Sequence, residues 1–272
     1  MPSFRKVYVD SAFRKGGGSG TNFKFEFPQL IECPGKCHVA VTALNFPNLL
    51  YTVLTNVNDR LWIYQVHPSN VALSLASTLQ IPEGNYSGTT LASAILTALT
   101  AAKLDQATYS VTFNPTSLKI TIQQSGGGGF IIFDSATLKQ NGPIGGLAVP
   151  NPMSLQDILN VPVSSSAQVT WESGPVTVTR LTQCFLRSPN LTNFGSLDSM
   201  GRRDVLKRVL LDSPFGYQMQ SSEDYQTSDL MDCSNRELSS CDFMLTDSHA
   251  NILSLQGHSI SFCLNFVFGD LE

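Results

Sequence analysis

The sequence predicts a mainly β protein, a Greek-key β-sandwich interrupted by a small α+β unit. In the last strong segment, apolar residues at alternate positions from Ile260 to Phe268 share one face, with polar residues such as Asn265 on the other. Phenylalanines alternate in the same way from Phe23 to Phe27. This alternation forms one apolar face on a strand and does not form one on a helix. Half-buried strands are therefore expected near both ends of the chain, as in a sandwich closed by its two ends.

Length and composition indicate a globular protein. The chain has 272 residues, of which 42% are hydrophobic and 14% charged, so it can bury a sizeable core. A net charge of −4 and a pI near 5.5 argue against a protein that coats nucleic acid. The first residues lack the apolar segment of a secretory signal, and no run approaches the roughly 18–20 apolar residues of a membrane span. We therefore expect a reducing compartment, in which the six cysteines are mostly free thiols.

Residues 1–20 are predicted to form a flexible basic arm. The segment contains Arg5, Lys6, Arg14 and Lys15 against one acidic residue, Asp10, and it ends in a glycine-rich run. A segment of this composition does not pack by itself. It is either an ordinary tail or an arm that becomes ordered on a neighbouring subunit or on a polyanion.

The sandwich is predicted to comprise residues 21–77 and 166–272, with short strands separated by turn-rich segments. From their composition we expect strands at residues 23–27, 37–44, 51–54, 60–66, 176–179, 183–186, 241–245 and 259–268, with 205–211 as a strand or a helical turn.

Residues 78–165 are predicted to form an inserted α+β domain. Leu91, Ile95 and Leu99 recur at four-residue spacing among alanines, which is typical of an amphipathic helix, and Thr89 or Thr90 can cap its start. A hairpin at 109–113 and 118–122 and a strand at 130–133 follow the helix.

The sequence offers little catalytic chemistry. The segment Cys33-Pro-Gly-Lys-Cys37-His38 is metal-like, but zinc sites typically draw on two paired knuckles and the second pair is missing. The glycines at 126–129 are not followed by the Lys-Ser/Thr of a phosphate-binding loop. There is no Gly-x-Ser-x-Gly motif, and no histidine is spaced to activate a nucleophile. We therefore predict that the protein is not an enzyme and has no catalytic, cofactor-binding or metal site.

One stretch of the chain shows a polarity of charge. Arg202, Arg203, Lys207 and Arg208 form a basic group, and an acidic group soon follows, made of Glu223, Asp224, Asp229 and Asp232. These groups are either two solvated loops or complementary contacts between identical subunits around a ring. On the second interpretation, the basic residues of this group and of the N-terminal arm are the candidate interface residues.

The order and spacing of several short motifs resemble those of the minor capsid (penton) proteins of virophages and Polinton-like viruses. The resemblance covers most of the chain, although each motif is short. The motifs are Val7–Arg14, Gly20–Phe25, Asn45–Asn48, Ile81–Tyr86, Phe243–Asn251 and Phe262–Phe266.

The resemblance implies a jelly-roll that forms homopentamers at the fivefold vertices of an icosahedral double-stranded-DNA virus capsid. Trimers of a double-jelly-roll major capsid protein would surround each pentamer, and the insert would form a second domain able to contact a host receptor or glycan. The family has no catalytic residues to carry over, and it implies no cofactor, specific nucleic acid or membrane span. The protein would reside in the virion after assembly in the cytoplasm or nucleus of the host cell.

Other functions fit the same β architecture. A jelly-roll binding module, lectin-like or a vertex receptor-attachment protein, would stack aromatic side chains on sugars, and Tyr217, Tyr225 and Trp171 are candidates. A tail-type interaction protein is a further alternative. An unrecognised hydrolase is disfavoured because the sequence lacks paired carboxylates and any nucleophile–base spacing.

Overall fold

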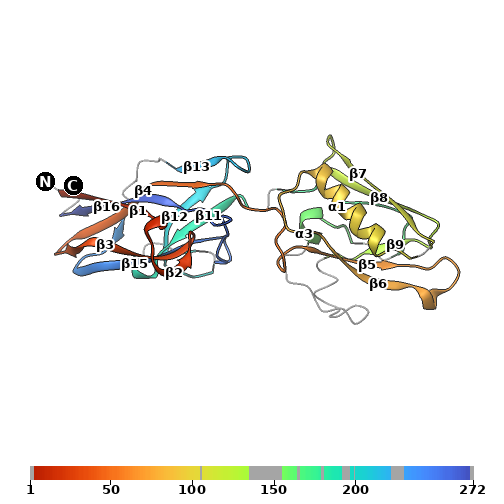
Figure 1. Cartoon of the computed structure of the whole chain (residues 1–272), viewed down its shortest axis with the longest axis horizontal. Coiled ribbons are helices and arrows are strands. Elements are labelled where there is room, and N and C mark those ends of the chain that lie inside the picture. The colour runs from red at the N-terminus through yellow and green to blue at the C-terminus, as the bar shows by residue number, and fades with distance from the viewer. Residues whose placement is uncertain are drawn as a thin grey trace. The chain divides into compact units, whose positions relative to one another are not determined.

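The computed structural model shows two compact units, drawn in Figure 1. The first unit comprises Met1–Leu50 and Leu181–Glu272, and the second comprises Tyr51–Arg180. The structure describes residues 3–104, 106–134, 155–163, 166–178, 181–191, 197–198, 200–221 and 230–269.

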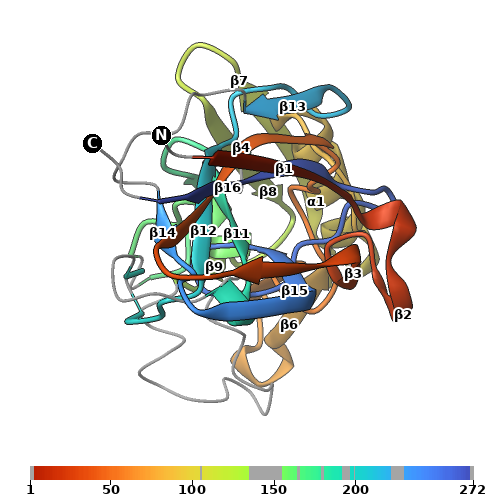
Figure 2. The same cartoon turned by 90° about the vertical axis from the view of Figure 1, so that its left-hand side faces the viewer.

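The first unit is a sandwich of two antiparallel five-stranded sheets. One sheet has the order β1-β16-β4-β13, with β14 also paired to β4, and the other has the order β12-β11-β15-β3-β2. Figure 2 looks onto this unit, with β1, β16 and β4 in the upper layer and β3 and β15 in the lower one. The strands are β1 (Ser3–Asp10), β2 (Lys15–Ser19), β3 (Asn22–Cys33), β4 (Cys37–Pro47), β11 (Gln183–Arg187), β12 (Val205–Leu210), β13 (Gln218–Ser221), β14 (Met231–Asp232), β15 (Arg236–Thr246) and β16 (Ser261–Phe268).

The strand order identifies a jelly-roll. If the short strands β2 and β14 are set aside, eight principal strands remain, and one sheet contains the first, eighth, third and sixth of them. The other sheet contains the fifth, fourth, seventh and second. This is the order that two interlocked Greek keys produce. The predicted fold class, a mainly β jelly-roll with an inserted α+β unit, is confirmed.

Alternating side chains fill the space between the two sheets. Phe243 on β15 packs against Phe262 on β16 with ring centroids 4.9 Å apart, and it also lies 5.7 Å from Phe23 on β3. The aromatic contacts therefore connect one sheet to the other. Full burial of each such side chain stabilises the fold by about 1.5–3 kcal/mol.

The N-terminal segment differs from the predicted flexible arm. Strand β1 pairs with β16 over its whole length, from Ser3 opposite Phe268 to Asp10 opposite Ser261. Val9 is buried in the sandwich core, and the Asp10 carboxylate accepts a hydrogen bond from the Ala12 N–H, 2.8 Å away, to start the short 3₁₀ helix η1 (Ser11–Phe13). The basic residues were compatible with a strand because an edge strand leaves many of its side chains in solvent.

The second unit contains two antiparallel three-stranded sheets, of order β6-β5-β9 and β10-β8-β7, and the helix α1. The Ser87 hydroxyl caps α1 and forms a reciprocal capping box with Thr90, so the cap lies two or three residues before the predicted one. Leu91, Ile95 and Leu99 are buried, as an amphipathic helix requires. The elements are β5 (Arg60–Gln65), η2 (Val71–Leu73), β6 (Leu75–Gln80), α1 (Gly88–Ala101), β7 (Thr108–Asn114), β8 (Lys119–Ser125), β9 (Phe130–Ile132), α3 (Leu155–Leu159) and β10 (Thr170–Glu172).

The boundaries of the insert lie at 50/51 and 180/181, whereas the sequence placed them at 77/78 and 165/166. Strand β5 was assigned to the sandwich, but it pairs with β6 and β9 inside the second unit. Its alternating pattern fits either sheet, and the pairing partner that decides between them lies far along the chain. Trp171 on β10 likewise belongs to the core of the second unit.

Two predicted strands are absent from the described part of the chain. Residues 51–54 form an isolated bridge, from Val53 to Gly84, rather than a strand. Residues 176–178 have no strand structure although Val176 is buried, and Thr179 lies outside the described residues. The segment 205–211, left open between strand and helical turn, contains the strand β12. Within the described ranges, none of the helices combines the length and apolar character that spanning a membrane requires.

Candidate functional site

The eight basic residues predicted as interface candidates lie at opposite edges of the jelly-roll. Arg5 and Lys6 are on β1, which ends one sheet, and Arg14 and Lys15 lie at or beside β2, which ends the other. We call β1, η1 and β2 the β1 wall. The remaining four candidates lie on β12, the other end of the second sheet, or in the loop before it, and we call this the β12 wall. They are Arg202, Arg203, Lys207 and Arg208.

The β1 wall combines cations with exposed aromatic rings. The Arg5 guanidinium donates to the Gln29 side chain, 3.1 Å away on β3, and the Arg14 guanidinium donates to the Ser11 carbonyl at 2.9 Å. Lys6 and Lys15 extend into solvent.

A groove of about 370 Å³ lies between β1 and β3 on this wall. Three aromatic side chains along the wall are largely exposed, Phe4 by 57%, Tyr8 by 75% and Phe13 by 75%. Aromatic and basic side chains gathered on an otherwise polar surface are typical of protein–protein contacts.

The β12 wall also combines basic side chains with exposed apolar ones. The Lys207 ammonium donates to the Val41 carbonyl of β4, 3.3 Å away, which ties this edge to the opposite sheet. Arg202, Arg203 and Arg208 are exposed, and Leu210 and Tyr217 add apolar surface, 58% and 66% exposed. The two walls therefore offer unlike surfaces at opposite edges of one sandwich. Of the predicted acidic group, Asp232 is on β14, whereas Glu223, Asp224 and Asp229 lie outside the described residues.

A buried arginine, which the sequence analysis did not single out, organises the loop before β12. Arg187 ends β11 and is fully buried. Its guanidinium donates to the Thr246 hydroxyl and to the carboxylates of Asp198 and Asp204, each at 2.7 Å. The two acids come from the segment that also contains Arg202 and Arg203. The sequence signal that could have identified this site is an arginine within an apolar strand. A charge buried in such a strand requires partners of opposite charge nearby.

Hydrogen bonds around Asp198 favour its charged form. Burial of this carboxyl opposes ionisation, but the backbone N–H groups of Arg202 and Met200 and the Arg187 guanidinium all donate to it. Together these donors hold the pKa of Asp198 below its ordinary value. The ion pair therefore fixes the loop that presents Arg202 and Arg203 on the β12 wall.

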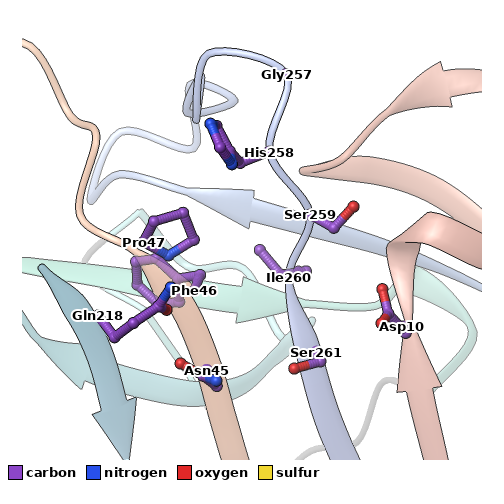
Figure 3. Close-up of a pocket in the computed structure, with 10 residues that line it drawn as sticks. All are labelled: Asp10, Asn45, Phe46, Pro47, Gln218, Gly257, His258, Ser259, Ile260 and Ser261. Atoms are coloured by element: carbon purple, nitrogen blue, oxygen red, sulfur yellow. The ribbon is translucent and has the colours of Figure 1, made fainter. Parts of the chain in front are cut away.

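A polar pocket of about 420 Å³ opens where several strands of one sheet end. Figure 3 shows its lining, with Asp10 on β1, Asn45 on β4 and His258 in the loop before β16. The Asp10 carboxylate is already engaged by the Ala12 N–H. The pocket therefore presents hydrogen-bonding groups from loops and strand ends rather than an acid–base pair prepared for catalysis.

The three aromatic residues proposed for sugar stacking do not share a site. Trp171 is only 2% exposed and packs in the core of the second unit, so its faces are covered. Tyr217 is 66% exposed but belongs to the jelly-roll unit. Tyr225 lies outside the described residues. The prediction that Trp171 stacks on sugars is therefore wrong, because burying a large indole in an apolar core is more favourable than leaving it in solvent.

All six cysteines are buried free thiols, and three of them meet. Cys33 and Cys37, which the sequence places on either side of one turn, lie next to Cys233 from a distant hairpin. Burial raises the pKa of Cys37 to about 12 and also raises the pKa of Cys233. Cys37 and Cys233 are 196 residues apart in the chain, so the spacing of cysteines in the sequence does not reveal that they are neighbours.

Comparison with known proteins finds similarity among solved structures only. No family model matches the chain, and no curated protein matches it. The strand order and the inserted unit define this chain as a jelly-roll protein with a second domain, and several solved structures are similar to it. A crystal structure of the mavirus penton protein is similar over 98% of this chain and 99% of that chain, with a TM-score of 0.52 and 9% sequence identity. This chain therefore has the fold of that penton protein, as the motif resemblance predicted.

Proposed function

We propose that this chain is a penton protein, a structural component of the vertices of an icosahedral double-stranded-DNA virus capsid. The observation that carries the proposal is the extent of the fold match, which includes both the jelly-roll and the insert and leaves almost none of either chain unmatched. A jelly-roll alone serves many functions. The same jelly-roll interrupted by a second unit is a more specific combination.

The two walls of the jelly-roll suit a closed ring. A ring of identical subunits is built from heterologous contacts, in which one surface of a subunit meets a different surface of the next. We propose that the β1 wall of one subunit meets the β12 wall of its neighbour in a homopentamer. Exposed apolar side chains such as Tyr8 and Leu210 would supply contact area, whereas the cations of the two walls would repel one another, so salt should favour the contact.

The partners follow from this role. Trimers of a double-jelly-roll major capsid protein would surround the pentamer, and the protein would reside in the virion. The insert is the unit that we propose for contact with a host receptor or glycan, and a glycan array probed with the full-length chain tests that part separately.

The first experiment is the solution mass of the full-length protein, by native mass spectrometry or sedimentation equilibrium. We expect a species of five times the 29.6 kDa chain. If the protein is a monomer alone, the deciding sample adds purified major capsid protein trimers, and electron microscopy should show the chain at fivefold vertices. A monomer that also fails to enter such shells would refute the proposal.

A pair of charge reversals tests the walls. Lys6→Glu and Arg208→Glu each change one exposed cation, on the β1 wall and the β12 wall respectively. Because both walls are basic, each reversal should replace a like-charge repulsion across the contact with an attraction and should strengthen pentamer formation or incorporation by about tenfold, and more at low ionic strength. Lys103→Glu is the matched control, because Lys103 is equally exposed but belongs to the insert. Equal assembly of all three variants would exclude these walls as the ring interface.

A further inference from the structure

The three clustered thiols lie where the chain twice crosses between the two sheets of the jelly-roll. Cys33 ends β3 and Cys37 begins β4, so both flank one crossover. Cys233 follows β14 and precedes β15, in the second crossover. The three sulfur atoms all lie within 4.8 Å of one another, and the Sγ atoms of Cys37 and Cys233 are 3.3 Å apart.

Main-chain hydrogen bonds hold the two crossovers in this arrangement. The Cys233 N–H donates to the Cys37 carbonyl at 2.9 Å, and the Asn235 N–H donates to the Cys33 carbonyl at 2.7 Å. The Ser234 hydroxyl accepts from the Cys37 N–H, 3.0 Å away. Gly35, with φ of +62°, forms the tight turn between Cys33 and Cys37. The thiols are therefore positioned by the backbone, and side-chain rotation is the main freedom left to them.

The geometry fits a metal ion better than a disulfide. Sulfur ligands placed tetrahedrally around Zn²⁺, with bonds of about 2.3 Å, lie roughly 3.8 Å from one another. This distance falls between the 3.3 Å that separates the Cys37 and Cys233 sulfurs and the 4.8 Å limit within which all three sulfurs lie. A disulfide would use two of the thiols and leave a third buried sulfur beside it. The sulfurs are also shielded, because the three cysteines are 2%, 0% and 1% exposed.

We propose that Cys33, Cys37 and Cys233 bind a single thiophilic cation, Zn²⁺ or Cu⁺, which joins the two crossovers of the jelly-roll. Thiolates select these ions over the hard cations that prefer oxygen ligands. On binding, each thiol loses its proton to solvent and its sulfur forms a bond to the metal. Cu⁺ is satisfied by three thiolates, whereas Zn²⁺ takes a fourth ligand from water.

His38 is not among the proposed ligands, although it completes the motif in the sequence. It follows Cys37 within β4, and successive strand residues point to opposite faces of a sheet. Its Nδ1 atom is buried without a hydrogen-bond partner, so it is a separate feature of the outer face. This proposal revises the sequence-based expectation of no metal site, because the third thiol comes from a residue 196 positions along the chain from Cys37.

The test is metal analysis of the full-length protein, purified under reducing conditions from medium supplied with zinc or with copper. Elemental analysis should find about one ion per chain and should distinguish Zn²⁺ from Cu⁺. Added Co²⁺ should give the intense visible bands of thiolate coordination, and Zn²⁺ should abolish them. This readout uses the native chain and does not depend on any variant folding.

Variants locate the site. Cys37→Ser and Cys233→Ser should each lower metal affinity by more than about tenfold. Cys184→Ala is the matched control, because Cys184 is equally buried but lies on β11 outside the cluster. A native chain that takes up no Co²⁺ would overturn the proposal, as would binding unchanged in both serine variants. Mass spectrometry showing a Cys37–Cys233 disulfide in a chain without metal would overturn it in favour of redox pairing.

Discussion

Arg187 shows how a single residue determines the shape of one wall of the jelly-roll. Its guanidinium is fully buried, and it is satisfied by two carboxylates and a hydroxyl that come from the following loop and from β15. A buried pair of this kind adds little net stability compared with apolar packing. Removing one partner is costly, however, because it leaves charge buried and unpaired. The ion pair therefore specifies the position of the loop more than it stabilises the fold.

The pKa of Asp198 gives this ion pair a dependence on pH. A carboxyl whose pKa is lowered by folding contributes stability above its ordinary value near 4, and that contribution is lost as pH falls through the lowered value. We expect Asp198→Asn to lower the free energy of unfolding by about 2 kcal/mol at pH 7, since Asp204 still pairs with Arg187. The difference from wild type should shrink below about pH 4. Urea denaturation at a series of pH values measures it.

Asp212→Asn is the control for this prediction, because Asp212 is an exposed carboxylate that follows β12. Its unfolding curve should follow that of wild type at every pH. If Asp198→Asn and wild type lose stability in parallel on acidification, the ion pair does not carry the expected charge dependence.

At the scale of elements, β1 is an integral edge of the sandwich. Deleting residues 1–10 would leave β16 as an unpaired edge strand and remove Val9 from the core. We expect a fall in unfolding temperature and self-association of the truncated chain, measured by thermal unfolding and light scattering. Lys6→Ala serves as the control, because it removes one exposed cation and keeps the strand. An unchanged unfolding temperature after the deletion would show that β1 is dispensable.

The elements that the sequence predicted well are those whose pattern is local. The alternation from Ile260 to Phe268 and the four-residue spacing of Leu91, Ile95 and Leu99 each place one face inward whatever the partner is. β16 and α1 therefore agree closely with the prediction. β1 was missed because it is an edge strand, with charged residues between its apolar ones.

The features that the sequence could not supply depend on contacts between distant residues. The pattern of β5 indicates a strand, but not that β9 is its neighbour. Likewise Cys37 and Cys233 meet across 196 residues, and no spacing rule connects them. The eight basic candidates were identified by composition, but their division between two opposite walls follows from the order of strands in the sheets.

At the scale of the whole molecule, the two units have separate hydrophobic cores that share no residue. We therefore expect calorimetry to show two unfolding transitions, each sensitive to substitutions in one core. Gly20→Ala should lower the jelly-roll transition, because a Cβ there would approach the His258 carbonyl to 2.0 Å. The expected cost is about 1–3 kcal/mol, since backbone rather than a side chain must move. Ile95→Ala should lower the other transition, because it leaves a cavity in that core that lowers the free energy of unfolding by about 2–5 kcal/mol.

Gly17→Ala is the matched control for the first variant, since a Cβ at Gly17 would meet no atom within 4 Å. It should leave both transitions in place. A single transition that both Gly20→Ala and Ile95→Ala lower together would mean that the units unfold as one cooperative body.

The pairing of β1 with β16 also dictates the order in which the protein can be completed during synthesis. The Ile260 N–H donates to the Ser11 hydroxyl across 249 residues, so the first strand has its partner only when almost the whole chain exists. The insert, by contrast, is contained in one continuous stretch that leaves the ribosome before β11 begins. Because domains fold as units during translation, the insert should be native while β1, β3 and β4 still await their partners. In that interval the apolar faces of three nascent strands must stay out of contact with other chains. The folded insert then lies between these strands and the ribosome along the growing polypeptide.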